Sequence, residues 1–157
     1  MSTNAAPIGA IMLDTGPLSL LTERPGRPLR EAAQKWLDTL TDAGIPVYVP
    51  EVADYELRRE LVRASHAASI GRLDTFIAGW PPRYVTVTTT AWRLAADLWA
   101  QARNAGQQTA PPEALDGDVI LAAQAITLAV PGLVVATTNP AHLSRFIAAA
   151  LWQDIAP

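Results

Sequence analysis

Acidic and amide side chains recur where the chain passes from one predicted element to the next. The first is Asp14, which ends the apolar run 11–13 and is followed by Gly16 and Pro17, a turn signal that stops a strand. The others are Glu56, Asp116, Asp118 and Asn139. Ligands bind at the carboxyl ends of the strands in open α/β sheets, so a parallel sheet would bring these side chains to one end of the molecule.

Carboxylates that converge repel one another, and a divalent cation offsets that repulsion. Oxygen ligands suit Mg²⁺ or Mn²⁺, whereas the chain has no cysteine and only two histidines to offer zinc. A bound ion of this kind can activate water and stabilise the leaving oxygen of a phosphodiester. We therefore predict a metal site with Asp14, Asp118, Glu56 and Asp116 as ligands.

Each of these positions also has a purely structural interpretation. Asp14, Asp116 and Asp118 could cap helices or occupy first turns, where the helix dipole favours negative charge. Asn139 precedes a proline and suits a helix N-cap. Glu56 could be a solvated helix acid, although its neighbours in sequence are apolar or aromatic. A functional and a capping role are compatible for Asn139.

The hydrophobic pattern predicts strands that alternate with helices. This alternation favours an α/β domain with a mainly parallel sheet and helices on both faces. Strands are predicted at residues 10–14, 47–49, 84–88 and 133–136, with an optional edge strand at 151–155. Helices are predicted near 29–40, 51–62, 70–80, 91–102, 119–128 and 141–148, with a short helical turn at 18–22, a loop at 104–112 and a flexible tail at 1–8.

Bulk properties limit the classes of protein that fit. A length of 157 residues suits a single domain spanning 1–157, and a hydrophobic fraction of 50% supports a sizeable core. The net charge of −3 disfavours a protein that coats polyanions, although bound metal can supply positive charge locally. Neither a signal peptide nor a membrane span is predicted, and the lack of cysteine fits a reducing cytoplasm.

Four segments stand in order along the chain, at residues 11–15 (IMLDT), 55–57 (YEL), 118–123 (DVILAA) and 136–143 (ATTNPAHL). Together they resemble the signature of PIN domains, and most closely that of VapC-type toxins from toxin–antitoxin pairs. The resemblance extends from about residue 10 to residue 155. Each segment alone is weak, and it is their order and spacing that is specific.

The resemblance implies a fold, an activity and partners. The implied fold is a three-layer α/β/α sandwich with a mainly parallel central sheet. The implied activity is that of a Mg²⁺- or Mn²⁺-dependent endoribonuclease, which would work as a homodimer and be inhibited by a small antitoxin protein. Asp14, Glu56 and Asp118 match the acidic, catalytic triad of the family. Asn139 matches a fourth position that is Asp in some relatives and Asn in others.

Further residues have supporting roles in this interpretation. Thr15 and Thr138 offer hydroxyls to a phosphate or to the ligands of the metal. Arg58, Arg59 and Arg63 could contact RNA, although such a cluster is more often a solvated helix face. The two histidines, His66 and His142, are too isolated in sequence to be predicted as general bases.

Other functions stay open at this point. The neutral Asn139 and the modest basic content also fit a non-catalytic PIN-like module that binds RNA or protein. A phosphotransfer enzyme with Asp14 as nucleophile would need a second Asp where Gly16 stands. A Toprim-type domain could use Asp116 and Asp118, but it expects Glu on an early strand, where this chain has Asp14.

Overall fold

A computed structural model describes residues 6–79, 83–106 and 112–157, with only the backbone described at 112–115. Its centre is a parallel sheet of five strands in the order β3-β2-β1-β4-β5. In sequence order they are β1 (Ala10–Leu13), β2 (Val47–Pro50), β3 (Tyr84–Val85), β4 (Leu133–Thr137) and β5 (Ala149–Leu151). Because all pairs are parallel, the carboxyl ends of the strands lie at one edge, and Leu13 pairs there with Ala136.

Helices connect the strands, as the alternating pattern predicts. They are α1 (Thr15–Thr22), α2 (Pro28–Asp42), α3 (Glu51–Arg63), α4 (Ala67–Ile77), α5 (Thr89–Asn104), α6 (Pro112–Leu128) and α7 (Pro140–Leu143), and a 3₁₀ turn, Trp152–Asp154, follows β5. Within the ranges that the structure describes, no helix has the length and apolar character needed to cross a membrane.

The central strand β1 is buried on both faces, and its side chains alternate between two clusters. Ile11 and Leu13 pack in the cluster that includes residues of α1 and α2, whereas Ala10 and Met12 pack in the cluster that includes residues of α6. All four side chains are fully buried. This alternation of successive side chains places helices against both faces of the sheet.

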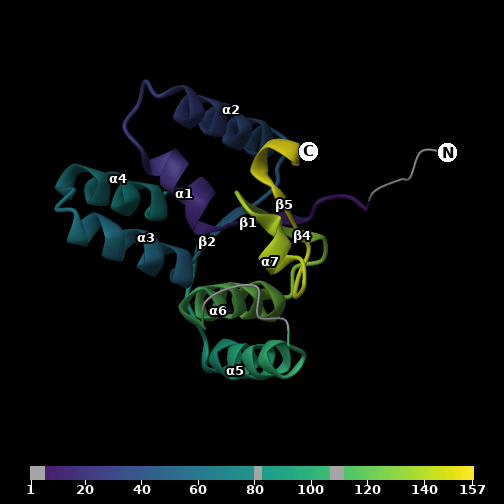
Figure 1. Ribbon diagram of the computed structural model, residues 1–157. Helices are drawn as coiled ribbons and strands as arrows, with labels where there is room; N and C mark the ends of the chain where they lie inside the picture. Colours follow the sequence, from purple (N-terminus) through teal and green to yellow (C-terminus); the bar gives the residue numbers. More distant parts are fainter. Residues whose placement is uncertain (1–5, 80–82, 107–111) are drawn as a thin grey trace.

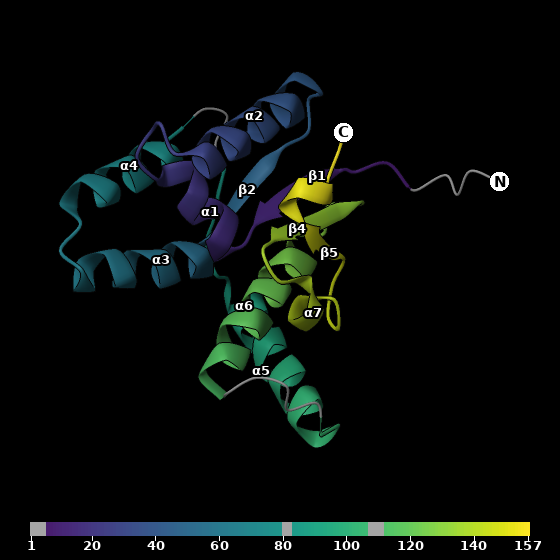
Figure 2. The ribbon, with the colours of Figure 1, turned by 45° about the horizontal axis from the view of Figure 1, so that its top comes forward.

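The expected three-layer PIN-type sandwich is nevertheless wrong. The sheet is small, with strands of two to five residues. Helix α5 packs its alanines Ala91, Ala95 and Ala102 against α6, outside the sheet (Figure 1). The pair α3 and α4 runs out past the sheet in both views (Figures 1 and 2). The described chain is an α/β fold in which α5 packs on the outside of α6, and α3 and α4 extend past the sheet.

Most element positions match their prediction, and the differences lie near the ends of strands and helices. The strand predicted at 84–88 is only Tyr84–Val85, and the helix predicted at 141–148 ends at Leu143. The edge strand lies at Ala149–Leu151 rather than 151–155. Of the predicted tail and of the loop at 104–112, residues 1–5 and 107–111 lie outside the described residues.

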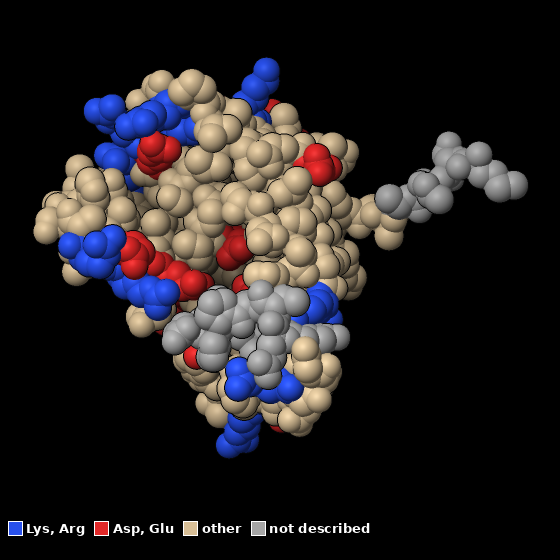
Figure 3. Space-filling view, viewed as in Figure 1, with Lys and Arg blue, Asp and Glu red and all other residues tan. Residues whose placement is uncertain are grey.

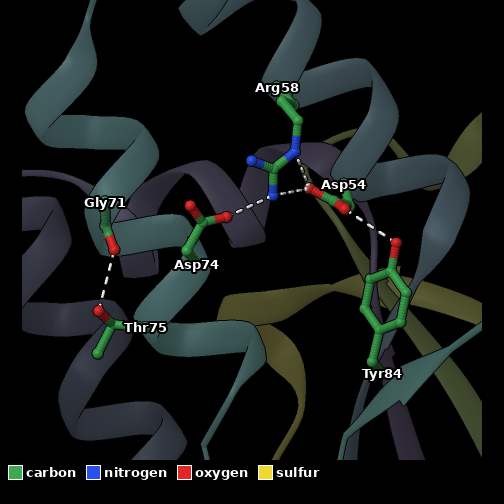
Figure 4. Close-up of polar contacts among 6 residues, drawn as sticks. All are labelled: Asp54, Arg58, Gly71, Asp74, Thr75 and Tyr84. Atoms are coloured by element: carbon green, nitrogen blue, oxygen red, sulfur yellow. Dashed lines mark hydrogen bonds and ion pairs between the residues drawn. The ribbon is translucent and has the colours of Figure 1, made fainter.

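A polar network fixes α3 to its neighbours. The Arg58 guanidinium of α3 contacts Asp54 on the same helix at 2.9 Å and Asp74 on α4 at 2.7 Å. The Tyr84 hydroxyl of β3 donates to Asp54 Oδ2 at 2.9 Å (Figure 4). Burial, followed by this hydrogen bond, raises the pKa of Tyr84. Asp54 is buried, so solvent screens its contacts with Arg58 and Tyr84 weakly, whereas the contact of Arg58 with Asp74 on α4 is exposed.

A second fixed point joins the end of the described chain to α2. Trp152 and Trp36 are both buried, and their rings meet edge to face with centroids 5.7 Å apart. The Trp36 indole donates to the Ile155 carbonyl at 3.0 Å, across 119 residues of sequence. The segment after β5 is therefore part of the main core.

Candidate carboxylate site

Asp14 lies at the carboxyl end of β1, as predicted, and it also begins α1. Its Oδ1 accepts a hydrogen bond from the Thr15 backbone N–H at 2.7 Å, and its Oδ2 accepts one from the Thr137 hydroxyl at 2.7 Å. Its own backbone N–H donates to the Ala136 carbonyl of β4. The strand-end and helix-cap interpretations of Asp14 are thus both correct, and the second strand fixes the orientation of its carboxylate.

Glu56 comes to the same place from α3. Burial raises the pKa of Glu56, and the negative charges of Asp14 and Asp118 raise it further, while Arg59 opposes them. The Arg59 guanidinium is 4.0 Å from Glu56 Oε2. Three carboxylates that are remote in sequence therefore lie close enough to influence one another electrostatically, although as they stand they do not form a group tight enough to hold a metal ion.

Asp118 is the seventh residue of α6, which begins at Pro112 rather than near 119, so neither Asp116 nor Asp118 caps this helix. Asp118 lies close enough to Asp14 to feel its charge. Burial, followed by the charge of Asp14, raises the pKa of Asp118. Its Oδ2 is buried and has no hydrogen-bond partner among the described residues. His142 Nδ1 is 3.6 Å from that oxygen, so this histidine, isolated in sequence, lies beside a carboxylate in the fold. A buried carboxylate oxygen that makes no hydrogen bond is a candidate ligand for a cation, and here it also lies beside His142.

Close packing of two helices defines the wall of the site. A Cβ atom added to Gly117 would lie 3.0 Å from Glu56 Oε1, so this glycine lets α6 approach the Glu56 side chain closely. Beside it is a pocket of about 740 Å³ with Glu51, Glu56 and Asp116 in its lining. Two exposed aromatic side chains, Tyr55 and Trp92, also line it. In the view of Figure 3, acidic atoms lie in a hollow near the centre of the molecule.

The remaining predicted site residues lie at the rim or serve the local structure. Asn139 is exposed, and its side chain caps α7 by accepting from the Ala141 N–H at 3.4 Å. The Thr138 side chain covers Gly16, where an added Cβ would come within 2.7 Å of its methyl group. The Thr15 hydroxyl is buried and makes no hydrogen bond of ordinary geometry, but it lies close enough to Glu56 to lower the pKa of that carboxyl.

The three arginines that were considered for RNA contact differ in their surroundings. Arg58 is engaged by Asp54 and Asp74, as described above. Arg63 forms an exposed ion pair with Glu60 at 2.9 Å. Arg59 lies over the Tyr55 ring at 5.2 Å and borders the pocket.

The residues of the site fit a cation with water in its shell better than one enclosed by protein. Within the described ranges, no group of three or more His, Cys, Asp and Glu is tight enough to hold a metal ion as the side chains stand. Mg²⁺ commonly keeps several waters and uses one or two carboxylates. The Asp118 oxygen that makes no hydrogen bond and the firmly oriented Asp14 carboxylate match that mode of binding.

Sequence reasoning missed three residues at or beside the site. Thr137, rather than Thr138, bonds to Asp14, and only the register of β4 against β1 decides between these neighbours. His142, on the short helix α7, approaches Asp118. Gln124 is a buried amide inside an apolar helix, and that unusual position was the available signal.

Comparisons with known proteins give a fold and no family. No protein-family model and no curated protein matches the chain. Among solved structures, it is similar to VapBC2 from Rickettsia felis bound to a DNA fragment from their promoter, with a TM-score of 0.69 and 14% identity over 91% of this chain and 98% of that one. It is also similar to FitAcB from Neisseria gonorrhoeae, with a TM-score of 0.64 and 22% identity over 92% of this chain and 99% of that one. A third similar structure is DNA-bound VapBC from Salmonella typhimurium, with a TM-score of 0.59 and 20% identity over 91% of this chain and 98% of that one.

These findings correct the recognition of the chain as a VapC-type PIN-domain toxin. The structures that it resembles are complexes of toxin–antitoxin systems, and identities of 14% to 22% show the fold alone. No family model supplies the PIN assignment in their place. The expected activity, that of a Mg²⁺- or Mn²⁺-dependent ribonuclease, is not supported either. Two of the three complexes are bound to DNA, and none is described with RNA.

Proposed function

We propose that this chain is one component of a two-protein toxin–antitoxin complex and that it binds a small partner protein. The observation that carries the proposal is the likeness to three such complexes over at least 91% of this chain. Exposed apolar side chains support it, since Tyr55 and Val62 on α3 and Trp92 on α5 are each more than half exposed. Within the same proposal the complex is cytoplasmic and contains a homodimer of this chain.

Co-expression with the product of the neighbouring reading frame tests partner binding. A stable complex is expected in size-exclusion chromatography with light scattering, and the mass of this chain alone reports whether it is a dimer. Tyr55→Ala is expected to weaken the complex, whereas Gln153→Ala, on an exposed and remote turn, is the matched control. Growth of cells that express each protein alone then assigns the role of each component. Two proteins that never associate would refute the proposal.

We also propose that the carboxylate site, defined as Asp14, Glu56 and Asp118 with Asp116 at its rim, binds Mg²⁺ or Mn²⁺. The mutual repulsion of the three carboxylates and the buried Asp118 oxygen that makes no hydrogen bond support this. Isothermal titration with Mn²⁺ is expected to show binding that Asp14→Asn abolishes and Asp97→Asn, an exposed change on α5, leaves intact. Equal binding by the two variants would rule out the site.

A further inference from the structure

The buried side chain of Gln124 joins three elements beside the carboxylate site. Gln124 belongs to α6 and is 1% exposed. Its Oε1 accepts a hydrogen bond from the Val52 N–H of α3 at 3.1 Å, and its Nε2 donates to the Val85 carbonyl of β3 at 2.8 Å. Both ends of the amide are thus bonded to backbone groups of other elements.

The bond to Val52 replaces a cap that α3 does not have. The first N–H groups of a helix have no partner within the helix, and a side chain at the N-cap usually accepts from one of them. The N-cap of α3 is Pro50, which makes no such bond. Gln124 supplies the acceptor from a different helix, so the start of α3 is fixed relative to α6.

The same two helices carry the carboxylates. Glu56 lies one turn after Val52 on α3, and Gly117 and Asp118 lie about two turns before Gln124 on α6. At that end, Gly117 and the Glu56 carboxylate are in close contact. The relative position of α3 and α6 is therefore determined at two points, by the Gln124–Val52 bond and by the packing of Gly117 against Glu56.

A neighbouring bond supports the same arrangement. Glu51 Oε2, in the first turn of α3, accepts from the Val87 N–H at 2.5 Å. Together with the Gln124–Val85 bond, it holds the segment between β3 and α5 against the start of α3. Val87 and Trp92, which follow on that segment and on α5, line the pocket.

We propose that Gln124 is a positioning residue of the carboxylate site, which fixes the first turn of α3 against α6 and so sets the separation of Glu56 from Asp118. The inference rests on the cation site proposed above. Gln124 contacts neither carboxylate and acts through Val52. An apolar residue in its place would leave a buried N–H and a buried carbonyl unpaired, which favours a shift of the helix.

The test compares Gln124→Met with Thr127→Val in the whole protein. Met keeps the length of the side chain and removes both hydrogen bonds. Thr127 is also on α6, but its hydroxyl bonds only to carbonyls of its own helix. Mn²⁺ affinity, measured by electron paramagnetic resonance, is expected to fall about tenfold or more in Gln124→Met, the usual cost of losing a residue that orients metal ligands. Thr127→Val is expected to bind as the wild type does.

The outcomes separate this inference from the proposed cation site. If the wild type binds Mn²⁺ and Gln124→Met binds it equally well, the positioning role is overturned and the cation site stands. An equal loss in Thr127→Val also overturns it, because the effect would then be one of general stability. A wild type that binds no Mn²⁺ overturns both.

A further variant covers the case in which Gln124→Met does not fold. Gln124→Glu keeps an acceptor for the Val52 N–H, and its carboxyl, which burial keeps protonated, also keeps a donor to the Val85 carbonyl. It is expected to fold, by circular dichroism, and to bind Mn²⁺ nearly as the wild type does. A large loss of affinity in the folded Gln124→Glu protein would contradict the role assigned to the Val52 bond.

Discussion

At the scale of single residues, the carboxylate site is held in an unfavourable electrostatic state. Burial and neighbouring negative charge raise the pKa of both Glu56 and Asp118. A raised carboxyl pKa means that the folded protein holds the proton more tightly than the unfolded chain does. The contribution of such a group to the free energy of unfolding is fully present below its ordinary pKa. It is lost as the pH rises through the pKa that the group has in the folded protein.

The raised pKa of Asp118 predicts how the thermal stability of Asp118→Asn compares with that of the wild type when no metal is added. The variant lacks the charge, so at pH 7 it is expected to have a higher Tm than the wild type, by about 2–4 °C for each kcal/mol relieved. The difference is expected to shrink as the pH falls towards 3.8, the ordinary pKa of the group. Thermal unfolding in EDTA from pH 3 to pH 8 measures it, with Asp97→Asn as the exposed control. A wild type that is the more stable protein at pH 7 would contradict the prediction.

Gly117 gives a prediction in which stability and binding change in opposite directions. Ala favours a helix over Gly by about 1 kcal/mol, so Gly117→Ala is expected to unfold at an equal or higher temperature. Its Cβ would displace the Glu56 carboxylate, which it meets at 3.0 Å, and Mn²⁺ binding is expected to weaken several-fold. Gly71→Ala on α4, where an added Cβ meets nothing within 4 Å, should raise stability alone. Unchanged Mn²⁺ affinity in Gly117→Ala would show that this contact does not matter.

At the scale of elements, α3 depends on contacts that join it to other parts of the chain. Asp54 accepts from Arg58 and Tyr84, and Arg58 in turn contacts α4. The exposed Glu60–Arg63 pair on the same helix offers a comparison, because exposed ion pairs contribute only about 0–1 kcal/mol.

Asp54→Ala is therefore expected to cost more than Glu60→Ala. Removing Asp54 leaves the Tyr84 hydroxyl without its acceptor and weakens the hold on α4, at a cost of about 1–3 kcal/mol. Glu60→Ala is expected to change stability by less than about 1 kcal/mol. Urea unfolding of both variants measures the difference, and equal losses would show that the network adds nothing beyond a surface pair.

Hydrophobic periodicity predicted most elements, because the spacing of apolar residues in an amphipathic helix shows which side of the helix is buried. The position of Asp14 at the end of β1 was also predicted from a local pattern, because an apolar run stops at this residue. What local pattern could not supply was the packing of α5 on α6, since an alanine face suits a helix as well as a sheet. Nor could it reveal the Gln124 bonds, which depend on residues 39 and 72 positions away. The cluster of carboxylates was predicted, but the class of protein inferred from it was not supported.

At the scale of the whole molecule, the end of the described chain closes the core. Trp152 is buried against Trp36, and Ile155 accepts the indole hydrogen bond. Strand β4 pairs with β1 across more than 120 residues of sequence, and β5 completes the edge beside it. The main core is therefore assembled from both ends of the chain.

Trp152→Ala tests how much the closing segment contributes. Replacing a buried Trp by Ala typically costs about 3–5 kcal/mol, a large part of the stability of a domain of this size. Denaturant unfolding of Trp152→Ala against Gln153→Ala, its exposed neighbour, measures this cost. A loss below about 1 kcal/mol in Trp152→Ala would mean that the core is complete without this segment.

The pairing of β1 with β4 also governs what happens during synthesis on the ribosome. When the first half of the chain has emerged, β1 has β2 beside it, but its other edge is open, because β4 has not yet been translated. An open edge with an apolar face is prone to pair with other chains. The nascent protein is therefore expected to need shielding by a chaperone until residues through Ile155 have been made, and newly made chains should be more prone to aggregate than refolded ones.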